Sequence, residues 1–455
     1  MCATKPMTQP STVTSGSPPP AVEFTCRSEP QPEHAFGTAF SLAASAFLIY
    51  FCMYGVRKPF ASGTYAGAYF LGTSIKLKTA LVLSQLIGYA ISKLSGIKFC
   101  SEASRRTRAW MILGCVGVSE LALIAFALVP GDWKALAMFV NGLPIGMIWG
   151  LVVAYLEGRR LFEVLFAGLS CSFILSSGAV KDVGSILLRH GVGEFWMPAV
   201  AGGLFLIPLV AGVWWLDRAP NPSREDIAAR VQREPMHMHD RRRFFRQFWP
   251  ALTPLIALYV LLTAFRDYRD NYGAEIYHQL GYGDSAGIFT QTETPIAIGI
   301  FLVFAFLTLV KDNRRAVRII YAVMLAGLMI MGAATYLHLS GWLHGFAWML
   351  LVGFGSYLAY VPFGAIIFDR LLAATQTGGT AIFAIYLADS VAYLGTVVIQ
   401  LQHDFFLPKV SHLDFLRGGS ALVSSLGILL LLIGWWFTHR CSLRVAAAAR
   451  PVDMR

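Results

Sequence analysis

The stretch "YFCMYGVRKPFASGTY", residues 50–65, places two cations inside a long apolar run. Arg57 and Lys58 are the only charged residues between Ala39 and Ile75. A charge inside a bilayer costs about 2.5–3.5 kcal/mol on insertion scales, so charged residues at that depth usually face a cavity and serve a function. The stretch therefore raises the question of what these two cations bind.

A second stretch, "YVLLTAFRDYRDNY" at residues 259–272, repeats this pattern. Tyr50 precedes Arg57 by seven residues, and Tyr259 precedes Arg266 by the same spacing. Seven residues make about two helical turns, so each tyrosine shares a helix face with its arginine. Because nearly half of the chain separates the two arginines, the pattern indicates two repeated halves, as many transporters have.

The composition is that of a polytopic membrane protein. The chain has 455 residues, of which 56% are hydrophobic and 14% are charged, too few charges to cover a soluble surface of this size. About 20 apolar residues span a bilayer, and runs of that length predict twelve helices. They lie at residues 38–57, 77–97, 109–129, 133–156, 161–187, 195–216, 248–270, 286–310, 316–338, 342–367, 377–401 and 418–439. The predicted fold is all-α, with the first helix continuing past Arg57.

The polar segments predict the domain organisation and the topology. Residues 217–247 hold eight arginines and five acids and divide the chain into six-helix halves at 37–216 and 248–440. This linker and the other loops on the same side are basic, which places them and both termini in the cytoplasm of a cell inner membrane protein. The Pro- and Ser-rich residues 1–36 and the residues 441–455 are expected to be cytoplasmic tails.

The same features argue against several other functions. The net charge of +11 is explained by the cytoplasmic loops, and no basic soluble domain is present to bind nucleic acid. The seven cysteines form no CxxC pair and the ten histidines form no metal-spaced cluster, so we expect no metal and no cofactor. We expect a monomer whose partners are the lipid bilayer and a small anionic substrate.

Arg57 and Arg266 are the leading candidates for a substrate site. In a bundle of two related halves they would face each other across a central cavity, and two guanidinium forks can hold a phosphate or carboxylate bidentately. The alternative is that each arginine snorkels to an interface or pairs with a nearby acid. Tyr50 and Tyr259 would donate hydrogen bonds to the anion. Secondary candidates for ligand contact are Lys58 and Gln85.

Four further charged residues are candidates for ion coupling or charge balance. Glu293 would carry a coupling proton, balance Arg266 or make an inter-helix hydrogen bond. Asp389 has no charged neighbour within a turn, which favours a coupling or cavity role. Lys181 and Asp182 are adjacent and cannot pair face to face on one helix, so they have either a functional role or a structural pairing at a helix end.

Three motifs resemble one branch of the major facilitator superfamily, the organophosphate:phosphate antiporters. The motifs are "YGVRKPF" with Arg57, "FRDYRDNYGAEIY" with Arg266, and "NGLPIGMIWG" at residues 141–150. This resemblance implies a transporter with two six-helix halves and an organic phosphate as substrate. The chain departs from the superfamily's loop signature after the second helix, where Ser92 and Lys93 replace an acid and an arginine. It also lacks the branch's histidine in the fifth helix.

Three functional classes remain open. The first is a secondary transporter that exchanges a small organic anion by alternating access. The second is a proton-coupled transporter of a sugar or another solute, although two facing arginines would repel cationic cargo. The third is a membrane enzyme or a receptor that does not transport. We expect no enzyme, because no nucleotide loop, zinc-protease motif or nucleophile motif is visible.

Overall fold

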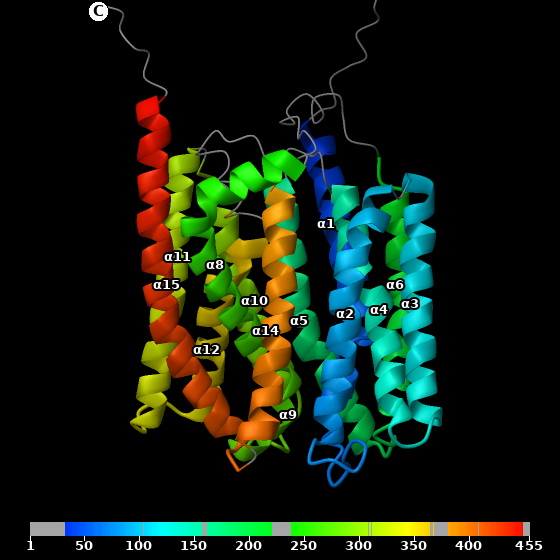
Figure 1. The fold of residues 1–455 in the computed structure, drawn as a ribbon. Coiled ribbons are helices and arrows are strands. Elements are labelled where there is room, and N and C mark those ends of the chain that lie inside the picture. The colour runs from blue at the N-terminus through cyan, green and yellow to red at the C-terminus, as the bar shows by residue number, and fades with distance from the viewer. Residues whose placement is uncertain are drawn as a thin grey trace, which may run out of the picture.

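The computed structural model describes residues 32–448, apart from residues 103, 157–161, 221–237, 308, 311, 365–366, 368–380 and 408. Within these residues twelve long helices run side by side in one bundle (Figure 1). This confirms the predicted all-α polytopic fold and the number of long helices. Most of the predicted N-terminal tail and the middle of the predicted linker lie outside the described residues.

Each predicted span overlaps one long helix. The first half contains α1 (Pro32–Gly55), α2 (Leu77–Glu102), α3 (Arg105–Leu128), α4 (Trp133–Leu156), α5 (Phe162–Arg189) and α6 (Met197–Asp217). The second half contains α8 (Met238–Asn271), α10 (Ile288–Leu307), α11 (Asn313–Leu339), α12 (Gly345–Tyr360), α14 (Ala381–Phe406) and α15 (His412–Ala448). Shorter elements are η1 (Pro59–Ser62), α9 (Gly273–Gln279) and η2 (Val361–Gly364). The start of α1 and the end of α15 lie at the same end of the bundle (Figure 1).

The first helix ends at Gly55, so the prediction that it continues past Arg57 is wrong. The chain turns through Val56, Arg57 and Lys58 before η1 begins at Pro59. Proline has no N–H to donate and disfavours a helical conformation in the residue before it. Because of this turn, Arg57 lines the cavity described below, whereas Lys58 pairs with Asp270.

Eight of the long helices have the length and apolar composition of membrane spans. The other four in the described part of the chain are α1, α2, α8 and α14. The described apolar stretch of α1 is short, α2 and α14 each carry a charged residue well inside the helix, and α8 carries four charged residues in its last two turns. These four helices supply most of the polar lining of the site described below, which explains their weaker apolar signal.

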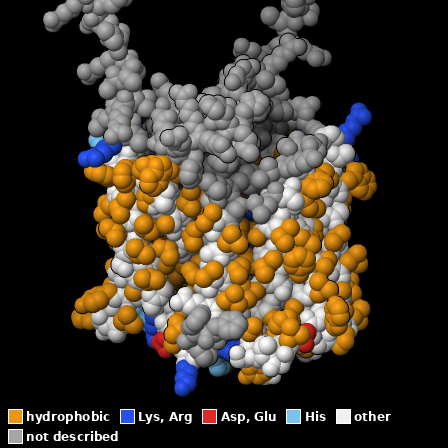
Figure 2. All heavy atoms as spheres, in the orientation of Figure 1, with side chains coloured by type: hydrophobic (Ala, Val, Ile, Leu, Met, Phe, Trp, Pro, Cys, Tyr) orange, Lys and Arg blue, Asp and Glu red, His pale blue; other side chains and the backbone are white. Residues whose placement is uncertain are grey.

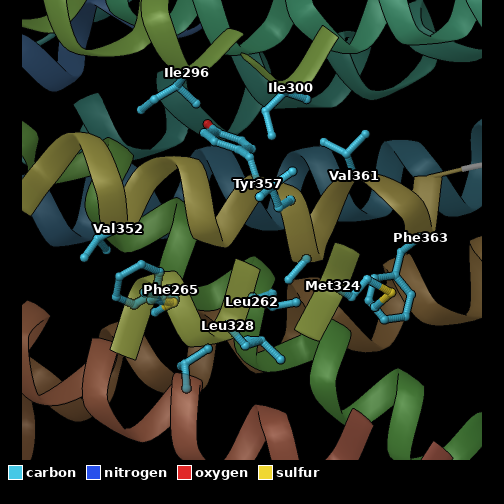
Figure 3. Packing of buried hydrophobic residues seen from close by; sticks show 14 of the residues in the cluster. Leu262, Phe265, Ile296, Ile300, Met324, Leu328, Val352, Tyr357, Val361 and Phe363 are labelled. Carbon is cyan, nitrogen blue, oxygen red and sulfur yellow. The ribbon is translucent and has the colours of Figure 1, made fainter. Parts of the chain in front are cut away.

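Two hydrophobic cores correspond to the two halves. One buried cluster comes mainly from α1–α6, and the other comes mainly from α8–α15. In the second cluster, Leu262 and Phe265 of α8 lie near Leu328 of α11 and Val352 of α12 (Figure 3). The halves meet where α5 packs on α10 and where α2 packs on α14. Apolar side chains cover the visible outer face, with charged side chains gathered near its two ends, as a bilayer requires (Figure 2).

The glycines of the "NGLPIGMIWG" motif allow α4 to approach α2 closely. A Cβ atom on Gly142 would lie 2.2 Å from the Gln85 carbonyl oxygen, and one on Gly146 would lie 2.8 Å from the Ser92 side chain. Small residues at such crossings let helix backbones touch in membranes. The preceding Asn141 is fully buried at the same crossing, so this contact also fixes the polar groups beside it.

Candidate functional site

A cavity of about 70 Å³ lies between the two halves, which is room for several water molecules. The first half contributes side chains from α1, α2, α4, α5 and the turn after α1, and the second half contributes them from α8, α12, η2 and α14. The lining residues are Tyr50, Tyr54, Arg57, Tyr89, Lys93, Trp149, Ser170, Phe173, Tyr259, Arg266, Tyr360, Val361, Asp389 and Tyr393. Three of these side chains are cations and one is an acid, so the lining has an excess of positive charge.

Arg57 reaches the cavity from the turn after α1. Gln85 Nε2 donates to the Arg57 carbonyl oxygen at 2.9 Å, and Asn141 Nδ2 donates to the Val56 carbonyl oxygen at 3.0 Å. These side-chain donors replace the helical hydrogen bonds that the turn lacks. The Arg57 guanidinium lies over the Tyr89 ring, with its Cζ atom 4.1 Å from the ring centroid. The backbone is therefore anchored while the charged group is free to meet a ligand.

No carboxylate forms an ion pair with Arg57 among the residues that the structure describes, although Arg57 is only 7% exposed. Its charged group is held instead by the faces of Tyr89 and Tyr54, which attract a cation more weakly than a carboxylate does. A buried charge without a counter-charge is unfavourable. Arg57 is therefore the strongest indication in this cavity that an anionic ligand binds there.

Arg266 reaches the same cavity from α8 and differs in having an acidic partner. Its Nη2 atom lies 2.7 Å from Asp267 Oδ1, and its Cζ atom lies 4.2 Å from the centroid of the Tyr360 ring. Both predicted arginines therefore line one cavity from opposite halves. For Arg266, however, the alternative of pairing with a neighbouring acid also holds.

Asp389 faces the cavity from α14 and pairs with Lys93 of α2. Lys93 Nζ lies 2.7 Å from Asp389 Oδ2, and Tyr259 Oη donates to Asp389 Oδ1 at 2.6 Å. Asp389 has no charged neighbour on its own helix, but it has one across the boundary between the halves. Lys93 lies within α2, as the predicted second span at residues 77–97 implies.

A cluster around Asp270 joins the halves at the end of the bundle where α9 lies. Lys58 Nζ lies 2.5 Å from one carboxylate oxygen of Asp270 and 2.8 Å from Asn271 Oδ1. Lys181 Nζ lies 2.7 Å from the other carboxylate oxygen, and Ser177 Oγ donates to that oxygen as well. We call these five residues the Asp270 cluster. Lys58, a predicted candidate for ligand contact, is held in this cluster and is not among the residues that line the cavity.

Other polar contacts join the halves near this cluster. Lys78 Nζ lies 2.5 Å from Glu275 Oε1 of α9, and Thr79 shares a 2.9 Å hydrogen bond with the Tyr272 hydroxyl. Asp182 accepts a 2.6 Å hydrogen bond from the backbone N–H of Thr290, in the first turn of α10. A carboxylate stabilises exposed N–H groups at the start of a helix. Asp182 thus makes a structural contact at a helix end, which was one of its two predicted roles. Lys181 does not pair with Asp182 and instead pairs with Asp270.

Two further expectations need correction. Glu293 does not balance Arg266, because its Oε1 atom lies 2.7 Å from Arg269 Nη1, one helical turn along α8. Gln85 does not line the cavity, because its amide donates to the Arg57 carbonyl and to Asn141 Oδ1. Gln85 therefore positions the Arg57 turn and makes no direct contribution to the lining.

Several lining residues were not predicted from the sequence. These are mainly aromatic, because Tyr89, Trp149, Phe173 and Tyr393 surround the charged groups. Aromatic residues are frequent in any membrane protein, so their identity alone gave no signal. Lys93 could have been found from the sequence, because it and Lys78 are the only charged residues of the second predicted span, residues 77–97.

A family model described as a family of unknown function, DUF5690, matches residues 59–440. The chain belongs to DUF5690. The comparison with curated proteins gives no match.

Several solved structures of transporters resemble this DUF5690 member. A D-xylose-proton symporter aligns with a TM-score of 0.58 and 15% identity, covering 89% of this chain and 98% of the symporter. The nucleoside transporter NupG aligns with a TM-score of 0.56 and 13% identity, covering 88% and 98%. A bacterial homolog of the human lysosomal transporter Spinster, inward-facing and unoccupied, aligns with a TM-score of 0.55 and 14% identity, covering 94% and 100%. At these identities the match establishes the major facilitator fold of this DUF5690 member and nothing narrower.

Proposed function

We propose that this protein is a secondary transporter that moves a small organic anion across the membrane by alternating access. The observation that carries this proposal is Arg57, a buried guanidinium in a cavity between the halves with no carboxylate paired to it among the described residues. Arg266 faces the same cavity from the other half, and two such forks suit a phosphate or a carboxylate.

The contacts between the halves support alternating access. The Asp270 cluster and the Lys78–Glu275 pair join the halves at the end of the bundle where α9 lies, and we infer that they close the cavity on that side. We propose that this side faces away from the cytoplasm, because the start of α1 and the end of α15 lie at the opposite end of the bundle (Figure 1) and the loop charges predict cytoplasmic termini. The halves at 37–216 and 248–440, joined by the segment 217–247, would then rock about the cavity and open each side in turn.

Exchange is the proposed mode of transport. Two facing arginines repel each other when the cavity is empty, and an anion between them attracts both. Binding then draws the halves together, so the loaded carrier changes sides more readily than the empty one. An organic phosphate is the proposed cargo, since the Arg57 and Arg266 motifs resemble those of the organophosphate:phosphate antiporters.

A second candidate is a proton-coupled transporter of a sugar or another solute. It is favoured by the aromatic lining and by Asp389, a carboxylate that faces the cavity. Aromatic faces pack against ring-shaped solutes, and an intramembrane carboxylate can carry a proton. This candidate leaves the unpaired Arg57 without an explanation, which is why we place it second.

Counterflow in proteoliposomes tests the proposal. Vesicles with the purified protein are loaded with one phosphorylated or carboxylated solute from a panel, and uptake of the labelled solute is measured without any ion gradient. We expect rapid counterflow of at least one anion, its loss in Arg57→Gln, and its retention in the control Arg315→Gln, whose side chain is exposed. Counterflow of neutral sugars only, or none for any solute of the panel, would contradict the proposal.

A further inference from the structure

We propose that each half of the bundle binds the headgroup of an anionic membrane lipid at its outer flank, on an arginine that packs against a tryptophan. The two arginines are Arg218, directly after α6, and Arg440 of α15. Neither residue is part of the cavity lining. This proposal therefore goes beyond the proposed transport function and does not depend on it.

The same sequence pattern recurs near the end of the last helix of each half. Residues 214–218 read "WWLDR", and residues 435–440 read "WWFTHR". In both patterns a tryptophan precedes the arginine by four residues, Trp214 before Arg218 and Trp436 before Arg440. Four residues are about one helical turn, so the two side chains meet on one face of the helix.

Both arginines pack against their tryptophans. The Cζ atom of Arg218 lies 3.4 Å from the centroid of the Trp214 ring, and that of Arg440 lies 3.7 Å from the centroid of the Trp436 ring. At these distances the guanidinium rests on the ring with its face, and the N–H donors along its edge can hold a phosphate bidentately. Among the residues that the structure describes, no carboxylate forms an ion pair with either arginine, although one Arg218 donor reaches the Trp214 carbonyl oxygen at 3.4 Å.

Each flank gathers further arginines from the start of a neighbouring helix. The start of α3 reads "RRTR" at residues 105–108, and the start of α11 reads "RRAVR" at residues 314–318. The helix α3 packs on α6, and α11 packs on α15. We call one group the α6 flank and the other the α15 flank. The α6 flank is Arg106, Arg108, Trp214 and Arg218, and the α15 flank is Arg314, Arg318, Trp436 and Arg440.

Aromatic side chains hold the two parts of each flank together. In the first half, the Arg108 Cζ atom lies 5.7 Å from the centroid of the Tyr155 ring, and the Tyr155 hydroxyl donates to Asp217 Oδ1 at 2.9 Å. In the second half, the ring centroids of Tyr321 and Trp435 are 4.9 Å apart. The starts of α3 and α11 therefore lie beside the segments that carry the two stacked arginines.

The acids beside these flanks leave an excess of positive charge. Asp217 already accepts the Tyr155 hydroxyl. Asp312 accepts from the backbone N–H of Arg314 at 2.8 Å, and its other carboxylate oxygen lies 3.6 Å from Arg315 Nε. Each flank itself contains three arginines and no acid, so the ligand that suits it is an anion.

The position of the flanks identifies this anion as a lipid. Both flanks lie at the end of the bundle where α1 starts, with α3 and α6 on one side and α11 and α15 on the other (Figure 1). Tryptophan is enriched at the level of the lipid headgroups, and the apolar outer face of the bundle begins next to this end (Figure 2). A lipid can lay its acyl chains on that face and its phosphate on the arginine. A free phosphate has no such chains, and a zwitterionic headgroup adds a cation that the arginines repel.

Native mass spectrometry of the detergent-purified full-length protein tests the proposal. The protein is mixed with phosphatidylglycerol or with phosphatidylcholine of the same acyl chains, and the lipids retained per protein are counted. We expect two phosphatidylglycerol molecules to be held in preference to phosphatidylcholine. Arg218→Gln and Arg440→Gln should each weaken one site by about fivefold, the contribution of one cation near an anionic lipid surface. The double variant should weaken both sites.

Two further variants distinguish the stacked arginine from a general attraction of charge. Arg218→Lys keeps the charge but loses the flat face and the bidentate fork. Trp214→Leu keeps the arginine but removes the ring on which it rests. Both should weaken the site at the α6 flank and leave the site at the α15 flank unchanged. Retention of phosphatidylglycerol as in the wild type by both variants would overturn the role of the stacked pair.

The matched control is Arg189→Gln, which changes an exposed arginine at the end of the bundle where α9 lies. It should keep both lipids, and thermal unfolding checks that every variant is folded. Equal retention of the two lipids by the wild type, or unchanged retention by the double variant, would overturn the proposal. Release of both lipids by millimolar inorganic phosphate, but not by chloride at the same ionic strength, would show a site for free phosphate and would overturn the lipid assignment.

Discussion

Lys58 Nζ lies 2.5 Å from a carboxylate oxygen of Asp270, and the two residues belong to opposite halves of the bundle. Each of them is close in sequence to an arginine of the cavity. Lys58 follows Arg57 directly, and Asp270 lies one helical turn beyond Arg266 on α8. The backbone segments that hold the two arginines therefore also hold the contact between the halves.

Asp270→Asn should loosen the contact between the halves. The change leaves Lys58 and Lys181 buried beside each other without their shared counter-charge, and breaking a buried pair in this way costs about 3–5 kcal/mol. We expect a lower unfolding temperature and a larger distance between spin labels on the Thr64 and Gly283 positions. The matched control is Asp284→Asn, an exposed acid in the nearby loop. Unchanged stability and distance would show that the Asp270 cluster does not hold the halves together.

Arg57→Lys should weaken anion binding without abolishing it. Lysine keeps the charge but loses the bidentate fork and the flat face that stacks on Tyr89. Arg57→Gln should remove most of the affinity. Saturation binding of the anion identified by counterflow measures both effects. Equal affinities for the wild type and the two variants would mean that Arg57 is a structural cation.

Gly142→Ala should destabilise the first half. Its Cβ would lie 2.2 Å from the Gln85 carbonyl oxygen, a backbone atom that cannot move aside without shifting α2. Overpacking of this kind costs about 1–3 kcal/mol. Gly114→Ala is the control, because a Cβ there meets no atom within 4 Å. Thermal unfolding followed by tryptophan fluorescence compares the two, and equal midpoints would contradict the close helix crossing.

Glu293→Gln should reduce stability and leave ligand binding unchanged. Glu293 pairs with Arg269 outside the cavity lining, so the substitution leaves a buried guanidinium with less counter-charge. The unfolding midpoint should fall, while the affinity for the transported anion and its pH dependence stay as in the wild type. A shift in the pH dependence with normal stability would instead favour the coupling role considered from the sequence.

The sequence predicted the helices because bilayer thickness forces long apolar runs, and it paired Arg57 with Arg266 because equal spacing placed them alike in both halves. It could not predict the partners of the buried charges. Glu293 is nearer to Arg269 than to Arg266 only because of how α10 and α8 are placed relative to each other, and Lys93 meets Asp389 only because α2 packs on α14. Such contacts depend on the relative rotation of helices far apart in the chain, which no local pattern encodes.

The surroundings of Arg57 and Lys58 could not be predicted from the sequence either, although the two residues are adjacent in the chain. A first helix that continued past Arg57 would have placed Lys58 about 100° around the helix axis from Arg57. The turn before Pro59 separates them more completely, with Arg57 toward the cavity and Lys58 toward the Asp270 cluster. The proline was visible in the sequence, but the hydrogen bonds from Gln85 and Asn141 that stabilise the turn were not.

The central claim is that one anion binds between Arg57 and Arg266. The most direct measurement is a crystal structure of the protein with tungstate, a tetrahedral dianion whose anomalous scattering marks its position. We predict a strong anomalous peak in the cavity, within hydrogen-bond distance of both guanidinium groups, and its loss in Arg57→Gln crystals grown in the same way. A cavity without a peak at saturating tungstate, or an Arg57 guanidinium that points away from the cavity into lipid, would contradict the claim.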